Sequence, residues 1–63
     1  MSLSINLRRL RITDGQSVDT VARATGLAPA LIHSIENGRD DVPPNVVRAL
    51  SHHFRMTDRE LLS

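Results

Sequence analysis

The spacing of apolar side chains along the chain predicts helices throughout. Leu3, Leu7 and Leu10 recur at steps of four and three residues, which places them on one face of a helix. We expect this helix to span residues 4–14, with Ser2 or Ser4 as its cap. A second stripe of the same kind lies nearer the C-terminus and consists of Val46, Val47, Leu50 and Phe54. No alternating run of β-branched residues indicates a strand, so the pattern predicts an all-α fold.

Glycine and capping residues divide the first half of the chain into two short helices. Gly15 ends the first helix. Ser17 can cap a second helix, because its hydroxyl accepts a hydrogen bond from a free amide of the first turn. Gly26 ends that second helix after two turns.

Three more helices follow. The third begins at Ala28-Pro29. Proline has no backbone N–H, and in the first position of a helix this causes no loss, because an N–H there would have no partner within the helix. The third helix ends at Asn37-Gly38, and the fourth begins at Pro44 or Asn45 after a polar loop. Thr57 and Glu60 have the spacing of a capping box, which predicts a short fifth helix at the C-terminus.

The length and composition describe one small domain over residues 1–63 with a thin core. A chain of this size buries about 60% of its unfolded surface. There are no cysteines and three scattered histidines. His52 and His53 point about 100° apart on a helix, so they cannot both bind one metal ion from it. We expect no metal and no cofactor, and a core that relies on packed helices or on a second copy.

Hydropathy and charge bear on the cellular location of the protein and on the partners it can bind. No apolar run approaches the roughly 20 residues of a membrane span, and the N-terminus lacks the charged start and apolar block typical of a signal peptide. We therefore expect a cytoplasmic protein that does not enter a membrane. The net charge of +1 is weak evidence for a polyanionic partner. All eight basic residues are arginine, which binds phosphate bidentately. Codon usage in a GC-rich genome is the favoured explanation for the arginines.

The order of these segments resembles the Cro/phage-repressor (XRE-type) helix-turn-helix family. The resemblance runs from about residue 3 to residue 62, through LRRLR, GQS, VARATGLAP, IHSIENGR and a final ELL. Its most specific parts are Ala22, Gly26, Ile32 and the stretch Ile35–Gly38. Ala22 is small enough for two helices to cross closely, and Gly26 permits a positive φ. The resemblance implies a compact five-helix bundle containing a helix-turn-helix, the lambda-repressor-like DNA-binding domain.

The family also implies a structural ion pair and a set of base contacts. The pair joins Arg11, late in the first helix, to Glu36, just before Asn-Gly. The base-contacting positions of the third helix correspond to Ala28, Pro29, Ala30, His33 and Ser34. This set is weakly polar: alanine methyls can pack on thymine methyls, and only His33 and Ser34 can hydrogen-bond to base edges. DNA shape would have to supply much of the specificity.

Contacts with the DNA backbone are implied for Ser17, Val18, Arg39, Asn45 and Arg11. Val18 departs from the family, which commonly has a phosphate-binding glutamine there, so only its backbone amide can donate. Asp40 and Asp41 share the loop of Arg39 and would repel phosphate.

Two further differences from the family affect the packing and the backbone of the domain. Gln16 replaces an apolar residue, so we expect one core contact to be weaker. Arg55 stands where the family often has glycine, so we expect a positive φ there at some cost in energy.

The sequence therefore predicts a DNA-binding transcriptional regulator that binds double-stranded DNA as a homodimer, with dimer contacts from Phe54, Met56 and Leu61. The alternative is a protein-interaction module, such as an antitoxin, a repressor inhibitor or a dimerisation domain, which has kept the fold but lost part of its DNA binding. An enzyme is not expected, because five short helices leave no pocket and no nucleophile stands near a base.

Overall fold

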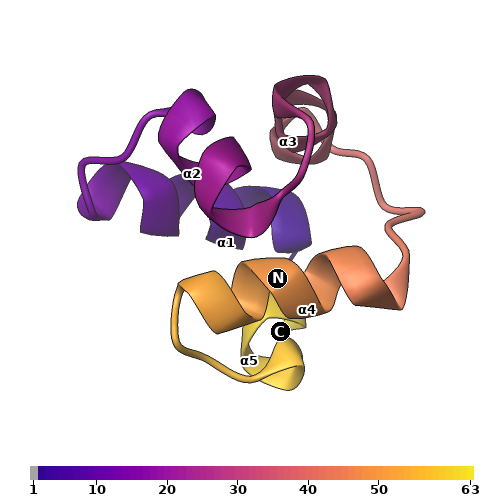
Figure 1. The fold of residues 1–63 in the computed structure, drawn as a ribbon. Helices are drawn as coiled ribbons and strands as arrows, with labels where there is room; N and C mark the ends of the chain where they lie inside the picture. Colours follow the sequence, from indigo (N-terminus) through magenta and orange to yellow (C-terminus); the bar gives the residue numbers. More distant parts are fainter. Residues whose placement is uncertain (1) are drawn as a thin grey trace.

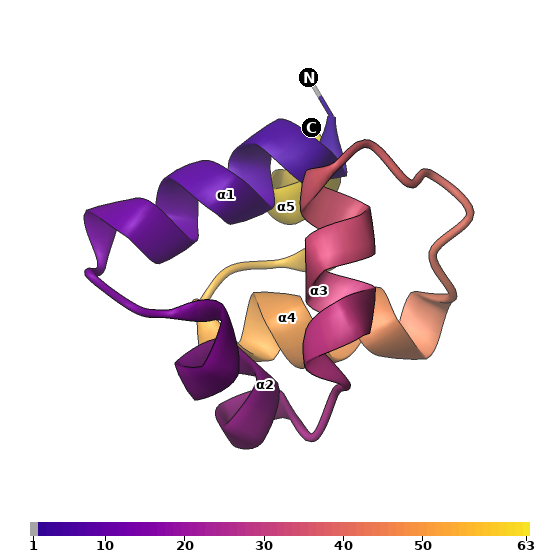
Figure 2. The same ribbon diagram turned by 90° about the horizontal axis from the view of Figure 1, so that it is seen from above.

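All five predicted helices are present in the computed structural model, which describes residues 2–63 (Figure 1). They are α1 (Leu3–Thr13), α2 (Val18–Thr25), α3 (Pro29–Glu36), α4 (Pro44–His53) and α5 (Asp58–Leu62). In Figure 1, α2 and α3 lie above α4 and α5, and α1 runs behind them. The view from above places the two ends of the chain close together, beside α1 and α5 (Figure 2). The predicted all-α, five-helix fold is confirmed.

The helix ends follow the local chemistry of the sequence closely. Ser2 caps α1 by accepting a hydrogen bond from the amide of Ile5 at 3.3 Å, so this helix begins one residue earlier than predicted. Ser17 caps α2 in the same way, through the amide of Thr20 at 3.1 Å. Gly26 then ends α2 in the left-handed conformation, with φ of 74°.

The capping box of α5 is complete. Thr57 Oγ1 accepts a hydrogen bond from the amide of Glu60, and a carboxylate oxygen of Glu60 accepts one from the amide of Thr57. These hydrogen bonds, first the one from the Thr57 amide, lower the pKa of Glu60. A helix of five residues is too short to be stable alone, so these hydrogen bonds are needed to stabilise its first turn.

The core lies where the five helices meet. Six large side chains in it are almost fully buried: Leu7, Val21, Ile32, Ile35, Leu50 and Leu61. Leu3, Ala22, Val46 and Val47 complete the buried apolar set. Among residues 2–63, none of the helices combines the length and the apolar character needed to cross a membrane.

The position of Leu61 corrects one prediction. Its side chain has no exposed surface, so it supports the core of its own chain and cannot serve the dimer contact expected of it. Phe54 and Met56 are half-buried and pack against the same core. A dimer contact through these two residues stays a prediction.

Two buried polar side chains attach α5 to the rest of the domain, and the sequence pattern did not reveal either. Asn6 of α1 donates from Nδ2 to the carbonyl oxygens of Leu61 and Ser63, at 2.8 Å each. Ser51 of α4 hydrogen-bonds to the carboxylate of Asp58 in the first turn of α5. Both ends of α5 are therefore held by hydrogen bonds from other helices.

Arg55 has the predicted positive φ, at 58°, in the turn between α4 and α5. A side chain in this region costs about 1 kcal/mol, whereas glycine is free of that cost. We expect Arg55→Gly to raise the free energy of unfolding by about 0.5 kcal/mol, since the greater chain entropy of unfolded glycine offsets part of the gain. Urea unfolding monitored by circular dichroism measures the change.

Arg55→Ala is the matched control, because it removes the same exposed side chain but keeps a Cβ. We expect no gain in stability from this variant. Equal stability of the glycine and alanine variants would contradict the assignment of strain to Arg55.

Candidate nucleic-acid interface

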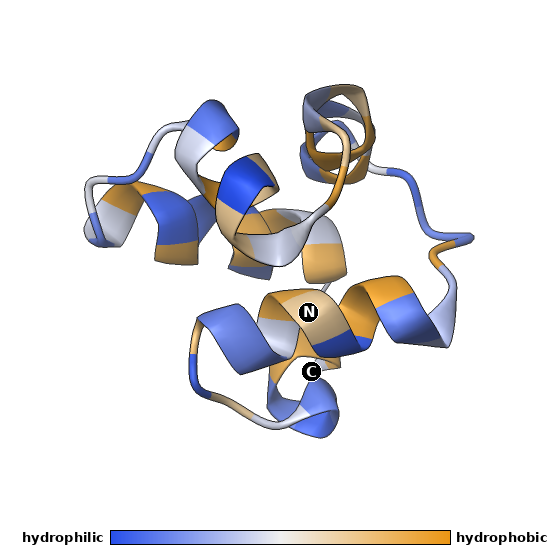
Figure 3. Ribbon diagram, viewed as in Figure 1, coloured by the Kyte–Doolittle hydropathy of each residue, from blue (hydrophilic) through white to orange (hydrophobic). Residues whose placement is uncertain are grey.

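The rotation of α3 is set by two fully buried isoleucines, Ile32 and Ile35. Helical periodicity then turns the positions between and before them away from the core. The five residues predicted to contact bases are all accessible to solvent. Ser34 is half-exposed, and the other four are exposed: Ala28, Pro29, Ala30 and His33. The structure brings all five together on what we call the exposed face of α3. Three of the five residues, Ala28, Pro29 and Ala30, have apolar side chains. Figure 3, coloured by hydropathy, shows both hydrophobic and hydrophilic residues on α3.

The turn between α2 and α3 has the geometry that a helix-turn-helix requires. Gly26 adopts a left-handed conformation, and the amide of Leu27 returns to the carbonyl of Ala22 at 3.1 Å. Ala22 is buried where α2 meets α3. Pro29 occupies the first turn of α3, which has no side-chain cap. The chain reverses within these few residues, so α2 supports α3 from one side.

The opposite end of α3 is fixed to α1 by the predicted ion pair. Arg11 binds Glu36 bidentately, with Nε at 2.7 Å from Oε2 and Nη2 at 2.9 Å from Oε1. The side chains are 17% and 7% exposed, so water screens the pair little. The hydrogen bond to Glu36 raises the pKa of Arg11 further above its ordinary value. Ser4 adds a hydrogen bond from its hydroxyl to the main-chain oxygen of Glu36, at 2.8 Å.

The same arginine continues into a chain of hydrogen bonds that reaches α4. Its Nη1 donates to the carbonyl oxygen of Gln16 at 3.0 Å. The side-chain oxygen of Gln16 lies 2.7 Å from Nε2 of His53, whose ring meets Phe54 edge to face. The expected loss of an apolar contact at Gln16 is therefore offset by a hydrogen bond to the end of α4, a partner that the sequence did not indicate.

The residues predicted to contact the DNA backbone differ in how available their side chains are for such a contact. Ser17 caps α2 and also contacts the hydroxyl of Thr20. Val18 is half-buried against the core, so its side chain serves packing. Asn45 is exposed in the first turn of α4. Arg11 is largely committed to Glu36 and to the carbonyl of residue 16, which leaves little of it for phosphate.

Arg39 is exposed in the loop after α3, where its Nε lies 2.9 Å from a carboxylate oxygen of Asp41. The hydrogen bond from Arg39, with its positive charge, lowers the pKa of Asp41. Ion pairs between exposed side chains contribute little to stability. Arg39 can therefore exchange this carboxylate for another anion at small cost.

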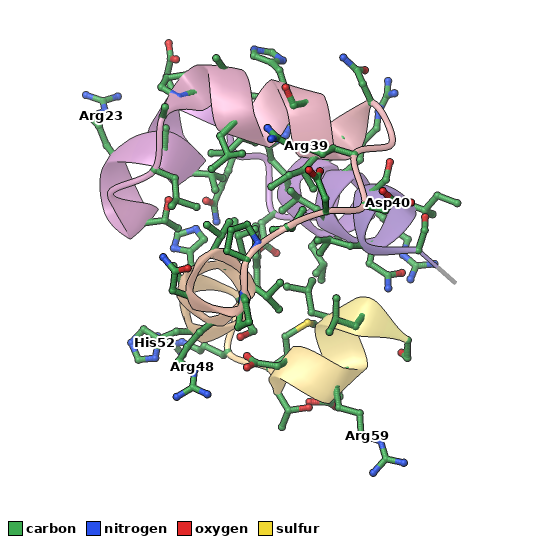
Figure 4. All side chains as sticks on the ribbon, turned by 90° about the vertical axis from the view of Figure 1, so that its right-hand side faces the viewer. Arg23, Arg39, Asp40, Arg48, His52 and Arg59 are labelled. Atoms are coloured by element: carbon green, nitrogen blue, oxygen red, sulfur yellow. The ribbon has the colours of Figure 1, made fainter. Side chains whose placement is uncertain are left out.

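The arginines labelled in Figure 4 are divided between two sides of the domain. Arg23 projects from α2 and Arg39 lies near α3, whereas Arg48 and Arg59, together with His52, lie on the side away from α3. Two of these labelled arginines therefore lie on the same side of the domain as α3. Within residues 2–63, no three histidine, aspartate or glutamate side chains are grouped to hold a metal ion.

Comparison with known proteins agrees with this geometry. The profile of a helix-turn-helix domain family matches residues 2–63, so the chain belongs to this family. The resemblance to XRE-type helix-turn-helix proteins is confirmed. The members of this family are DNA-binding regulators and not enzymes. No curated protein matches the sequence.

Among solved structures, the chain is similar to the restriction-modification controller protein C.AhdI from Aeromonas hydrophila. The two are 28% identical, with a TM-score of 0.86, and the match covers 95% of this chain and 91% of that one. The structural match therefore extends over nearly the whole of both chains.

The Arg11–Glu36 pair generates a prediction about stability. Glu36→Ala leaves a mostly buried guanidinium without its partner, and we expect it to lower the free energy of unfolding by about 3 kcal/mol. Replacing both residues with leucine removes the unpaired charge, so we expect this double variant to recover most of the loss. Urea unfolding of the three proteins tests this, and a Glu36→Ala protein as stable as the original would contradict it.

Proposed function

We propose that this protein is a sequence-specific transcriptional regulator that binds double-stranded DNA as a homodimer, with α3 in the major groove. The observation that carries the proposal is the exposed face of α3, held at one end by the Gly26 turn and at the other by the Arg11–Glu36 pair. A helix of this kind fits the major groove, and two-fold symmetry would place two of them one helical turn apart. The likeness to a controller protein supports the same proposal.

Base recognition in this proposal depends on few groups. His33 hydrogen-bonds to a guanine acceptor or a phosphate, and Ser34 hydrogen-bonds to a base edge. Ala28, Pro29 and Ala30 contribute apolar contact with thymine methyls and close approach. Each good direct contact is worth about 1–3 kcal/mol, so DNA shape and deformability supply part of the specificity.

Attachment to the DNA backbone comes from the residues around that face. Arg39 releases Asp41 and binds a phosphate, while Asn45 and Ser17 donate hydrogen bonds to neighbouring phosphates. At Val18, the backbone amide at the start of α2 donates in place of a side chain. These contacts set the position of α3 and carry no sequence information.

Selection of bound sites from random duplex DNA, followed by titration, tests the proposal. We expect His33→Ala to weaken binding to the selected duplex by about 1–3 kcal/mol and to relax the preference at one base pair. His52→Ala is the matched control, because this histidine is exposed on α4 on the side away from α3 (Figure 4), and we expect it to bind unchanged. Binding to no duplex at low salt would overturn the proposal.

The ion pair between Arg39 and Asp41 in the loop after α3 gives a second prediction. Asp41→Asn removes a negative charge from the interface and frees Arg39, so we expect binding to strengthen about threefold at low salt. Arg39→Ala should weaken binding to all duplexes and lower the slope of log K against log salt by about 1 per half-site.

Glu60→Gln controls for net charge, because Glu60 lies in α5, on the side away from α3 (Figure 4), and glutamine can keep the capping box. Equal strengthening of binding by Glu60→Gln and Asp41→Asn would show that the effect is one of net charge alone.

The apolar start of α3 favours a second candidate function, a protein-interaction module that keeps the fold. Ala28, Pro29 and Ala30 are exposed side by side and offer a surface for an apolar partner. Leu31, half-buried beside them, packs against the core. Recovery of one partner protein that survives nuclease treatment and is lost in Ala30→Glu, together with no duplex binding, would favour this candidate.

A further inference from the structure

The turn that ends α3 contains the dipeptide Asn37-Gly38, and both of its residues are exposed. In such a pair the main-chain nitrogen of the glycine attacks the side-chain amide of the asparagine readily, because glycine has no side chain to obstruct the approach. The two other asparagines of the chain lack this neighbour. Asn6 is buried and precedes a leucine, and Asn45 is exposed but precedes a β-branched valine.

The surroundings of Gly38 leave room for the reaction. Within residues 2–63, a Cβ built on this glycine would meet no atom within 4 Å beyond its own chain neighbours. Its φ of 108° lies in the region that side chains disfavour, which explains why glycine occupies the position. The fold therefore places a residue without a side chain next to an exposed asparagine.

We propose that Asn37-Gly38 is a site of spontaneous deamidation, and that the reaction lowers the affinity of the chain for DNA with time. The main-chain nitrogen of Gly38 bonds to Cγ of Asn37, and the side-chain nitrogen leaves as ammonia with the hydrogen of the Gly38 amide. Water then opens the resulting succinimide ring. Opening at Cγ gives aspartate, whereas opening at the main-chain carbonyl gives isoaspartate, whose main chain is one atom longer.

The reaction needs the last turn of α3 to open, because it removes the hydrogen of the Gly38 amide. That amide donates to the carbonyl oxygen of Ile35 at 3.0 Å, and the amide of Arg39 donates to that of Ser34 at 3.1 Å. The preceding residue, Glu36, is held to α1 by its side chain and its main-chain oxygen. The exposed turn can therefore open while α3 and the core stay in place.

The effect on DNA binding rests on the proposed function, since the turn is bonded to the residues proposed to contact bases. The amide of Asn37 donates to the carbonyl oxygen of His33 at 3.0 Å, and that of Arg39 to the carbonyl oxygen of Ser34. Aspartate at position 37 adds a negative charge at the C-terminal end of α3, where the helix dipole is already negative. This charge cancels the net charge of +1. Isoaspartate also displaces the Arg39 amide, so both products weaken attachment to DNA.

Incubation of the full folded chain in neutral buffer, followed by digestion and mass spectrometry, tests the proposal. Exchange of an NH2 group for OH marks each asparagine that has reacted. We expect conversion at Asn37 to be at least about tenfold faster than at Asn45, because valine hinders the attack that glycine permits. Asn45 is thus a matched control within the same molecule, since it is also exposed. Conversion at Asn37 no faster than at Asn45 would overturn the proposal.

A parallel incubation in urea separates local opening from global unfolding. We expect Asn37 to react more slowly in the folded chain than in the unfolded chain by about tenfold to a hundredfold, because one turn must open first. Slowing by the whole equilibrium constant of folding, measured by urea unfolding of the same protein, would overturn the assignment of the reaction to the folded chain.

Titration of a selected duplex with fresh and incubated protein tests the effect on DNA. We expect the incubated chain to bind at least about threefold more weakly at low salt, and fresh Asn37→Asp to reproduce part of this loss. Asn37→Gln is the matched control, because the longer side chain closes its ring much less readily, so this variant should keep its affinity throughout the incubation.

Failure of this inference is distinguishable from failure of the proposed function, because mass spectrometry detects the reaction without DNA. An unreacted Asn37 in a chain that binds a selected duplex overturns only the deamidation site. Conversion at Asn37 with unchanged duplex binding overturns the proposed effect on affinity. Conversion in a chain that binds no duplex when fresh supports the site and overturns the DNA-binding proposal.

Discussion

The attachment of Glu36 to α1 is the interaction on which the rest of the structure depends. An eight-residue helix such as α3 has little stability of its own, so its position must come from contacts at both ends. At the start, the Gly26 turn joins it to α2. At the end, Arg11 binds the side chain of Glu36 and Ser4 binds its main-chain oxygen. Two residues of α1 thus hold one residue of α3, and the exposed face of α3 is oriented as a consequence.

The other short helices are held by the same means. A domain of 63 residues buries a small core, so hydrogen bonds from buried and half-buried polar side chains add connections that apolar contacts alone do not supply. Asn6 holds the end of α5, Ser51 holds its beginning, and Gln16 connects the α1–α2 turn to His53. These links leave the outer surfaces of the helices free for partners.

The chemistry of the exposed face of α3 matters for the proposed function. This face has only two hydrogen-bonding side chains, those of His33 and Ser34, so in that proposal contacts with phosphate and the shape of the DNA carry much of the affinity. One copy with so few contacts would bind weakly, and the proposed second copy would multiply the contacts through symmetry.

The sequence by itself determined the features that arise from neighbouring residues. The five helices, the serine and threonine caps of α1, α2 and α5, and the positive φ at Gly26 follow from spacing and local chemistry. The resemblance to the family added the positive φ at Arg55. The family pattern also indicated the Arg11–Glu36 pair. Only the tertiary structure decided which distant residues meet. Asn6 is 55 residues from Leu61, and Gln16 is 37 residues from His53, so no local pattern links them. Helical periodicity marked Leu61 and Leu62 alike as apolar, but the docking of a five-residue helix buried the first and exposed the second, because only one face of a helix can meet the core.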